Sequence, residues 1–112
     1  MVSTPTQPRD DPSPLKAVYR ITYPNGKIYV GMDLTGTLLY FGSVNRQLVE
    51  ADFSIEQRRD FTMRKEILWE SATATDAEVR RREVELIREL RANDPAIGYN
   101  RRPQRPPATT EP

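Results

Sequence analysis

The chain has 112 residues, enough for one domain, and its 17 basic and 16 acidic residues leave a net charge of +1. This balance neither favours nor excludes a nucleic acid as partner. The chain has no histidine and no cysteine, which excludes a disulfide framework, a Ser-His-Asp triad and a zinc site built on His or Cys. Any metal would be a hard, oxygen-bound cation, and any general base a tyrosine, a lysine or a carboxylate.

Proline is concentrated at the two ends of the chain. Eight of the ten prolines lie in residues 1–14 and 103–112, and such segments bury too little apolar surface to offset the entropy lost on ordering. We therefore expect two disordered tails around a domain at residues 15–102. No apolar run approaches the roughly 20 residues that span a bilayer, and the first residues lack the apolar segment of a signal peptide. These features predict a cytoplasmic protein without a membrane partner.

The first predicted structure is a β-hairpin. Residues 17–23 and 27–31 are rich in β-branched and aromatic side chains, which is typical of strands. Between them, Pro24-Asn25-Gly26 predicts a three-residue loop, because proline suits the first central position of a type I turn and glycine suits the left-handed position that follows.

The length of this loop fixes which residues pair across the hairpin. With three loop residues, Ile21 lies opposite Tyr29 and Tyr19 lies opposite Gly31. Paired residues share a face of the sheet, so Tyr19 and Tyr29 are predicted to project from the same side. A two-residue loop would place them on opposite sides.

The middle of the chain carries weaker signals. Residues 34–43 are compatible with an extended segment or with a packed loop. Ser43 is predicted to cap a helix that continues to Phe53, and Ser54 followed by Gln57 predicts a second, short helical turn.

A third strand is predicted at Phe61–Glu70. Phe61, Met63, Ile67 and Trp69 recur at every second position, with Lys65 as the exception.

The strongest helix signal follows that strand. Thr75 and Glu78 form a capping-box sequence that opens a predicted helix at Asp76–Arg91, and Asn93-Asp94-Pro95 ends it. Gly98-Tyr99-Asn100 then forms a short extended or looped segment. The order of elements predicts an α+β domain with a small, mainly antiparallel three-stranded sheet and flanking helices.

One carboxylate of the predicted helix stands in an apolar position. Val79, Leu86, Ile87 and Leu90 form a stripe on one side of the helix, and Glu83 falls on the same line. A charge there is costly unless it is paired or bound to a metal. Two interpretations stay open: a half-buried glutamate held by an arginine or a tyrosine hydroxyl, or a functional carboxylate.

The order of these features resembles the GIY-YIG nucleases. The resemblance rests on Ala17-Val18-Tyr19, on Tyr29-Val30-Gly31, on Glu83 within the helix and on the terminal Gly98-Tyr99-Asn100, and it covers about residues 17–101. It implies a metal-dependent DNA endonuclease or nicking domain that hydrolyses phosphodiester bonds.

The resemblance also implies roles for residues. Glu83 would bind one Mg²⁺ or Mn²⁺, either Tyr19 or Tyr29 would deprotonate the attacking water, and Asn100 would orient or hydrogen-bond these groups. Which of the two tyrosines is the base stays open.

Two departures from the family pattern affect the predicted site. Met32-Asp33 stands where the family usually has a basic residue, and Leu39 stands where its arginine normally lies. The resemblance then gives the arginine's role to Arg46, on the helix after the loop. Arg58, Arg59 and Arg64 remain candidates for the same role.

These departures leave a second function open, a GIY-YIG-like module that binds nucleic acid or a protein without cutting. A domain this small has little surface for reading bases, so target choice would require a homodimer, a partner protein or DNA shape. Arginines also cluster at 80–82 and at 101, 102 and 105. Such clusters can contact phosphates or can belong to a solvated face.

Overall fold

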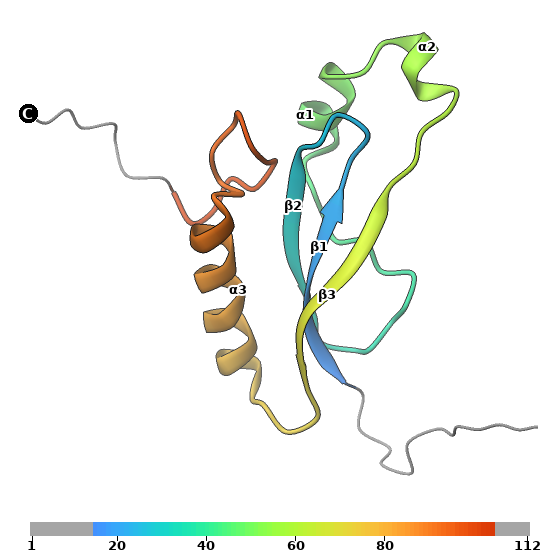
Figure 1. Cartoon of the computed structure of the whole chain (residues 1–112). Helices are drawn as coiled ribbons and strands as arrows, with labels where there is room; N and C mark the ends of the chain where they lie inside the picture. Colours follow the sequence, from blue (N-terminus) through green and yellow to red (C-terminus); the bar gives the residue numbers. More distant parts are fainter. Residues whose placement is uncertain (1–14, 105–112) are drawn as a thin grey trace, which may run out of the picture.

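A computed structural model describes residues 15–104, which form an α+β fold (Figure 1). Residues 1–14 and 105–112, which make up most of the predicted tails, lie outside the described residues. The elements follow in the order β1 (Lys16–Thr22), β2 (Ile28–Asp33), α1 (Arg46–Ala51), α2 (Ile55–Arg58), β3 (Arg64–Ser71) and α3 (Asp76–Leu90). The strands form one antiparallel sheet in the order β2-β1-β3, which confirms the predicted fold class.

The hairpin has the predicted loop and register. The N–H of Gly26 donates to the carbonyl of Tyr23 at 2.8 Å, and the N–H of Tyr23 donates to the carbonyl of Lys27 at 2.9 Å. Gly26 has φ +88°, the left-handed conformation that glycine adopts without strain. Ile21 therefore lies opposite Tyr29, as the loop length predicts.

The prediction for the start of the third strand was wrong. β3 begins at Arg64 rather than at Phe61. Phe61 instead lies in the segment that leads into β3, where its ring packs against Phe53 with centroids 4.9 Å apart. Phe61 is therefore apolar because it packs in the core and not because it belongs to a strand.

The predicted alternation along the third strand was also wrong, because β3 contains a bulge. Val18 lies opposite Trp69, whereas the next residue of β1, Tyr19, lies opposite Ile67, so Leu68 is the extra residue. Beyond the bulge the strand changes phase. Leu68 and Trp69 both pack against the core on the α3 side, and Ile67 is 50% exposed.

Residues 34–43 form a loop rather than a strand. Lys65 of β3 organises part of it by donating to the carbonyls of Thr37, Leu38 and Tyr40 at 3.4, 3.0 and 2.7 Å. The ammonium group also lies 4.8 Å from the centroid of the Tyr19 ring. These contacts explain why a lysine interrupts the apolar positions of β3.

The first helix starts later than Ser43. Asn45 is the N-cap of α1, and its side chain accepts a hydrogen bond from the N–H of Leu48. Asparagine and serine cap helices equally well, so the two candidates could not be separated by residue type. The capping box of α2, formed by Ser54 and Gln57, is present as predicted.

The last helix matches its sequence signals closely. Thr75 and Glu78 form the predicted capping box, and Arg91 ends α3 in a left-handed conformation with φ 61°. The helix packs its apolar stripe on one face of the sheet (Figure 1). Among residues 15–104, no helix is long and apolar enough to cross a membrane.

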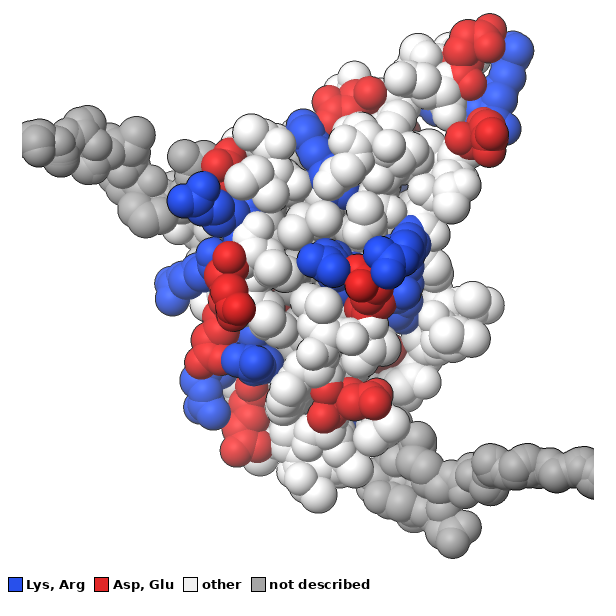
Figure 2. Space-filling model, viewed as in Figure 1, with Lys and Arg blue, Asp and Glu red and all other residues white. Residues whose placement is uncertain are grey.

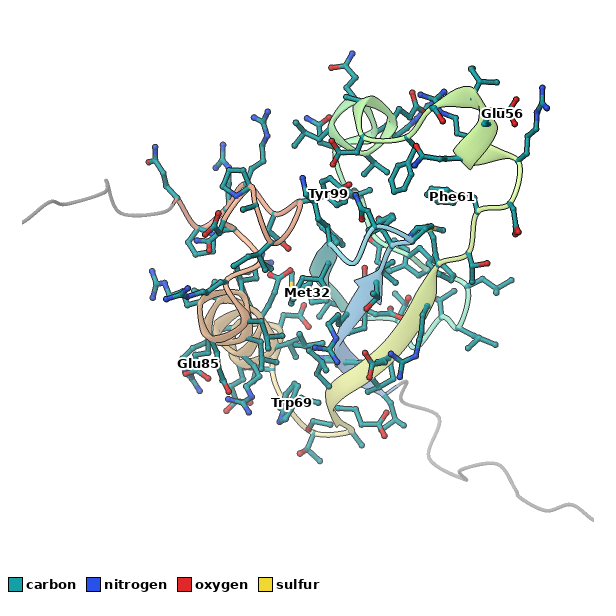
Figure 3. The ribbon with its side chains drawn as sticks, turned by 45° about the horizontal axis from the view of Figure 1, so that its top comes forward. Met32, Glu56, Phe61, Trp69, Glu85 and Tyr99 are labelled. Atoms are coloured by element: carbon teal, nitrogen blue, oxygen red, sulfur yellow. The ribbon has the colours of Figure 1, made fainter. Side chains whose placement is uncertain are left out.

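The sheet separates two apolar clusters (Figure 3). The cluster on the α3 face includes Val18, Val30 and Met32, and Figure 3 shows Met32 and Trp69 between the sheet and α3. The cluster on the opposite face is largely aromatic and continues to α1 and to the C-terminal segment. Its buried members are Tyr19, Ile21, Tyr23, Val49, Phe53 and Tyr99.

The segment after α3 runs along the outer edge of β2. Ile28 and Gly98 form a parallel bridge, in which the N–H of Tyr99 donates to the carbonyl of Ile28 at 2.8 Å. A Cβ atom at Gly98 would contact the carbonyl oxygens of both Ala92 and Ile28. Only glycine therefore allows this segment to approach β2 so closely.

Candidate active site

An open pocket of about 560 Å³ lies where the edge of β2, α3 and the C-terminal segment meet. Tyr29, Glu83 and Asn100, three of the five predicted site residues, line it together. The other predicted residues, Tyr19 and Arg46, are not among the residues that line this pocket. Its full lining consists of Tyr29, Ser43, Asn45, Arg80, Glu83, Val84, Ile87, Tyr99, Asn100, Arg101, Arg102 and Pro103.

Tyr19 lies behind this pocket and is fully buried. A Cβ atom built on Gly42 would contact both the Tyr19 hydroxyl and the Tyr29 ring, so the two tyrosines meet on the same face of the sheet, as predicted. Among residues 15–104 the Tyr19 hydroxyl has no hydrogen-bond partner. Burial, followed by the neighbouring Tyr29, raises the pKa of Tyr19 far above its usual value, which makes it a poor base.

Tyr29 is half-buried and reaches the pocket from β2. Burial raises the pKa of its hydroxyl, while the polar groups of Ser43 oppose the rise. The charge of Glu83 raises this pKa further. Of the two tyrosines, Tyr29 is the one that a molecule in the pocket could contact.

Glu83 is half-buried on the side of α3 that faces the pocket. Burial raises the pKa of its carboxyl group, and the nearby positive charge of Arg80 opposes this effect. Within residues 15–104, Glu83 makes no hydrogen bond and no ion pair. The sequence left open that an arginine or a tyrosine hydroxyl holds Glu83 in a purely structural role. Among these residues, neither contact is present.

Asn100 pairs with the backbone of β2 through its side chain. The N–H of Val30 donates to Oδ1 of Asn100 at 2.8 Å, and Nδ2 donates to the carbonyl of Val30 at 2.8 Å. The amide thus makes the two bonds that a neighbouring strand would make. Because Val30 follows Tyr29 directly, Asn100 fixes the backbone that carries the tyrosine.

A second set of contacts, a polar network that the sequence did not predict, holds the C-terminal segment through the side chain of Tyr99. The Tyr99 hydroxyl donates to Asp52 at 2.7 Å and accepts from Asn25 at 2.9 Å, and Lys27 pairs with Asp52 at 3.0 Å. The hydrogen bonds from Tyr99 and Lys27 lower the pKa of Asp52. The network joins the hairpin turn to the end of α1. Asn25 and Tyr99 belong to motifs noted in the sequence, whereas Asp52 belongs to none.

Arg46 lies at the N-terminus of α1, where its side chain is 84% exposed and pairs with Glu50 at 3.4 Å. It lines a different hollow, on the side of the aromatic cluster. The other candidates for the family's arginine also have partners within the protein. Arg58 donates to two backbone carbonyls near the end of α1, and Arg59 and Arg64 each pair with a glutamate.

Three other arginines line the pocket instead, namely Arg80, Arg101 and Arg102. Each belongs to one of the basic clusters seen in the sequence.

Figure 2 shows acidic and basic side chains alternating along α3 on the face in view, and Figure 3 shows Glu85 pointing away from the sheet. The acidic residues on the outer face of α3 thus contrast with Glu83, which lines the pocket.

The pocket offers one carboxylate to a cation. Residues 15–104 contain no group of three or more His, Cys, Asp or Glu residues that could hold a metal ion. Mg²⁺ is commonly bound through one or two carboxylates together with waters and substrate phosphates, so a single unpaired glutamate beside an open pocket fits such an ion.

No protein-family model, curated protein or solved structure matches this chain.

Proposed function

We propose that this chain is a metal-dependent DNA endonuclease or nicking domain of the GIY-YIG type. The observation that carries the proposal is that Tyr29, Glu83 and Asn100, from three separate parts of the chain, meet at one open pocket. These are positions to which the resemblance gives catalytic roles. Three arginines in the same pocket supply the positive charge that a phosphodiester substrate requires.

Glu83 is the residue that would hold Mg²⁺ or Mn²⁺. Its carboxylate has no ion pair among residues 15–104, so its charge is available to a cation in the pocket. A divalent cation held there supplies positive charge that stabilises the charge developing on a phosphate oxygen.

Tyr29 is the residue that would accept the proton of the attacking water. It lines the pocket, whereas Tyr19 is fully buried, and the charge of Glu83 acts on both hydroxyls. The polar groups of Ser43 favour the anionic form of Tyr29, and positive charge brought into the pocket would favour it further. Asn100 contributes by fixing the strand beside Tyr29.

A second candidate function is a module of the same kind that binds nucleic acid or a protein without cutting. Burial raises the pKa of Tyr29, so without added positive charge this tyrosine is a weak base at neutral pH. A homodimer or a partner protein would then supply target choice, and any chemistry would belong to the partner.

A nicking assay on supercoiled plasmid separates the two functions. The proposal predicts relaxed or linear product with wild-type protein in Mg²⁺ or Mn²⁺ and none in EDTA. Fluorescence anisotropy with a labelled duplex measures binding in parallel. Binding without nicking in either cation would reject the nuclease and support the binding module, and the absence of both would reject the nuclease and any module that binds DNA.

A further inference from the structure

The arginines of residues 15–104 fall into two groups. One group makes hydrogen bonds or ion pairs through its guanidinium groups: Arg20, Arg46, Arg58, Arg59, Arg64 and Arg82. The side chains of the other group make neither within these residues: Arg80, Arg81, Arg88, Arg91, Arg101 and Arg102. All four candidates for the family's arginine, Arg46 included, belong to the first group.

Half of the second group lines a single pocket. Arg80, Arg101 and Arg102 line the hollow that also contains Glu83 and Tyr29. Arg81 and Arg88, by contrast, are equally exposed on α3 but do not line it. Three of the six arginines without a side-chain partner among residues 15–104 thus line the same pocket as Glu83.

The backbone presents these arginines in fixed positions. Arg80 lies one helical turn before Glu83 on α3. Arg101 and Arg102 lie between two anchors, because Asn100 is bonded to β2 and Asn93 donates to the carbonyl of Pro103 at 2.8 Å. The scaffold therefore limits the positions from which these guanidinium groups reach the pocket.

Arg101 and Arg102 also border a second hollow. It measures about 540 Å³ and is lined by residues 101–104, so Arg101, Arg102 and Pro103 line both hollows.

We propose that Arg80, Arg101 and Arg102 form the phosphate-binding side of the pocket, in the role that the resemblance gave to Arg46. Arg80 contacts the reactive phosphate, and the pair at 101 and 102 contacts a neighbouring phosphate of the same strand. Guanidinium groups suit this role because they donate two parallel hydrogen bonds to phosphate oxygens. The inference rests on the proposed function, since it assigns phosphate contacts within that site.

The pair at 101 and 102 is tested by binding in EDTA, where no cleavage occurs. The double variant R101A/R102A is compared with R81A/R88A, which removes the same charge from exposed positions outside the pocket. A labelled duplex is titrated at several salt concentrations. We expect R101A/R102A to make the slope of log K against log salt shallower by about 1.8, because each lost phosphate contact removes about 0.9. The control should keep the wild-type slope. Equal changes in both variants would show a general charge effect and overturn the assignment.

Arg80 is tested by single-turnover nicking against the neighbouring R81A. We expect R80A to slow nicking by about 100-fold, the usual loss when one donor to a developing negative charge is removed. R81A should nick at the wild-type rate, and melting curves should show that both variants are folded at the assay temperature. If R46A loses nicking while R80A behaves like R81A, the arginine role belongs to Arg46 and the inference is wrong.

Failure of the proposed function gives a different pattern. Wild-type protein that binds DNA but never nicks would reject the nuclease, and the salt slopes would still decide whether Arg101 and Arg102 contact phosphates. Wild-type protein that does not bind DNA would reject the inference together with the function.

Discussion

The hydroxyl of Tyr19 lies against Gly31, the residue opposite it in the hairpin. A Cβ atom at Gly31 would stand 2.5 Å from this oxygen and 2.7 Å from Cζ of the same ring. The glycine is therefore required by packing and not by a left-handed backbone, since its φ is not positive. The fully buried tyrosine and the glycine form one packing unit beside the pocket.

Gly31→Ala should destabilise the domain by about 1 to 3 kcal/mol, because the methyl group must displace a ring that has no free space. Urea unfolding measures the cost. The same substitution in a Tyr19→Phe background should cost less, because the nearest atom has been removed. An equal cost in both backgrounds would show that the strain arises elsewhere.

Tyr19→Phe by itself should stabilise the domain by about 1 kcal/mol, because it removes a buried hydroxyl that has no partner among residues 15–104. It should also keep nicking, whereas Tyr29→Phe should abolish it, because Tyr29 is the proposed base. Melting curves and plasmid nicking of the two variants check this assignment. Loss of nicking in Tyr19→Phe alone would transfer the role to Tyr19.

Short sequence motifs correctly predicted the hairpin and the start of the last helix, because contacts between neighbouring residues determine both. Pro24-Asn25-Gly26 predicted the loop and the register of β1 with β2, and Thr75 with Glu78 predicted the start of α3. The bulge in β3 could not be predicted, because it depends on how Leu68 and Trp69 pack on a distant helix.

The candidate site was predictable to a similar degree. Glu83 was recognisable because a charge interrupted an apolar stripe, and the structure places it in a pocket with Tyr29. The arginines that line the pocket were not predicted by the spacing of the family pattern. The place that this spacing gives to the arginine falls in the loop at residues 34–43, whose path depends on contacts from Lys65 in β3.

Asp33→Asn should destabilise the domain at pH 7 by about 2 kcal/mol, because the carboxylate accepts three hydrogen bonds from Thr35 and Thr37. Burial opposes ionisation of Asp33, but these bonds and the charge of Lys65 outweigh it and lower its pKa below 3.8. The stabilisation is thus present above pH 3.8 and lost as the pH falls through the pKa of the folded state. The difference from wild type should shrink in acid. Asp60→Asn, an exposed control, should change stability little at pH 7.

Asn100→Ala should lower stability by about 2 kcal/mol, because it leaves the N–H and the carbonyl of Val30 without their partners. Nicking should fall as well, because the strand beside Tyr29 loses its support. Urea unfolding and plasmid nicking measure the two effects. Lost nicking with unchanged stability would instead show that Asn100 contacts the substrate directly.

Glu83→Gln should leave the melting temperature at pH 7 unchanged or raise it. Burial raises the pKa of Glu83 above its usual 4.5, so its ionisation costs stability as the pH rises beyond that value. Glutamine removes this cost, and the gain should disappear below pH 4.5, where Glu83 is protonated in both states. A loss of about 3 to 5 kcal/mol would instead identify Glu83 as a partner in a structural ion pair.

The plasmid-nicking activity of Glu83→Gln is the sharpest test of whether Glu83 holds a divalent cation in a nuclease site. The variant keeps the size of the side chain and removes the charge that would hold the cation. We expect a folded protein that produces no nicked plasmid in Mg²⁺ or Mn²⁺ under conditions in which the wild-type protein cuts. Nicking at the wild-type rate by Glu83→Gln would show that Glu83 does not have this role.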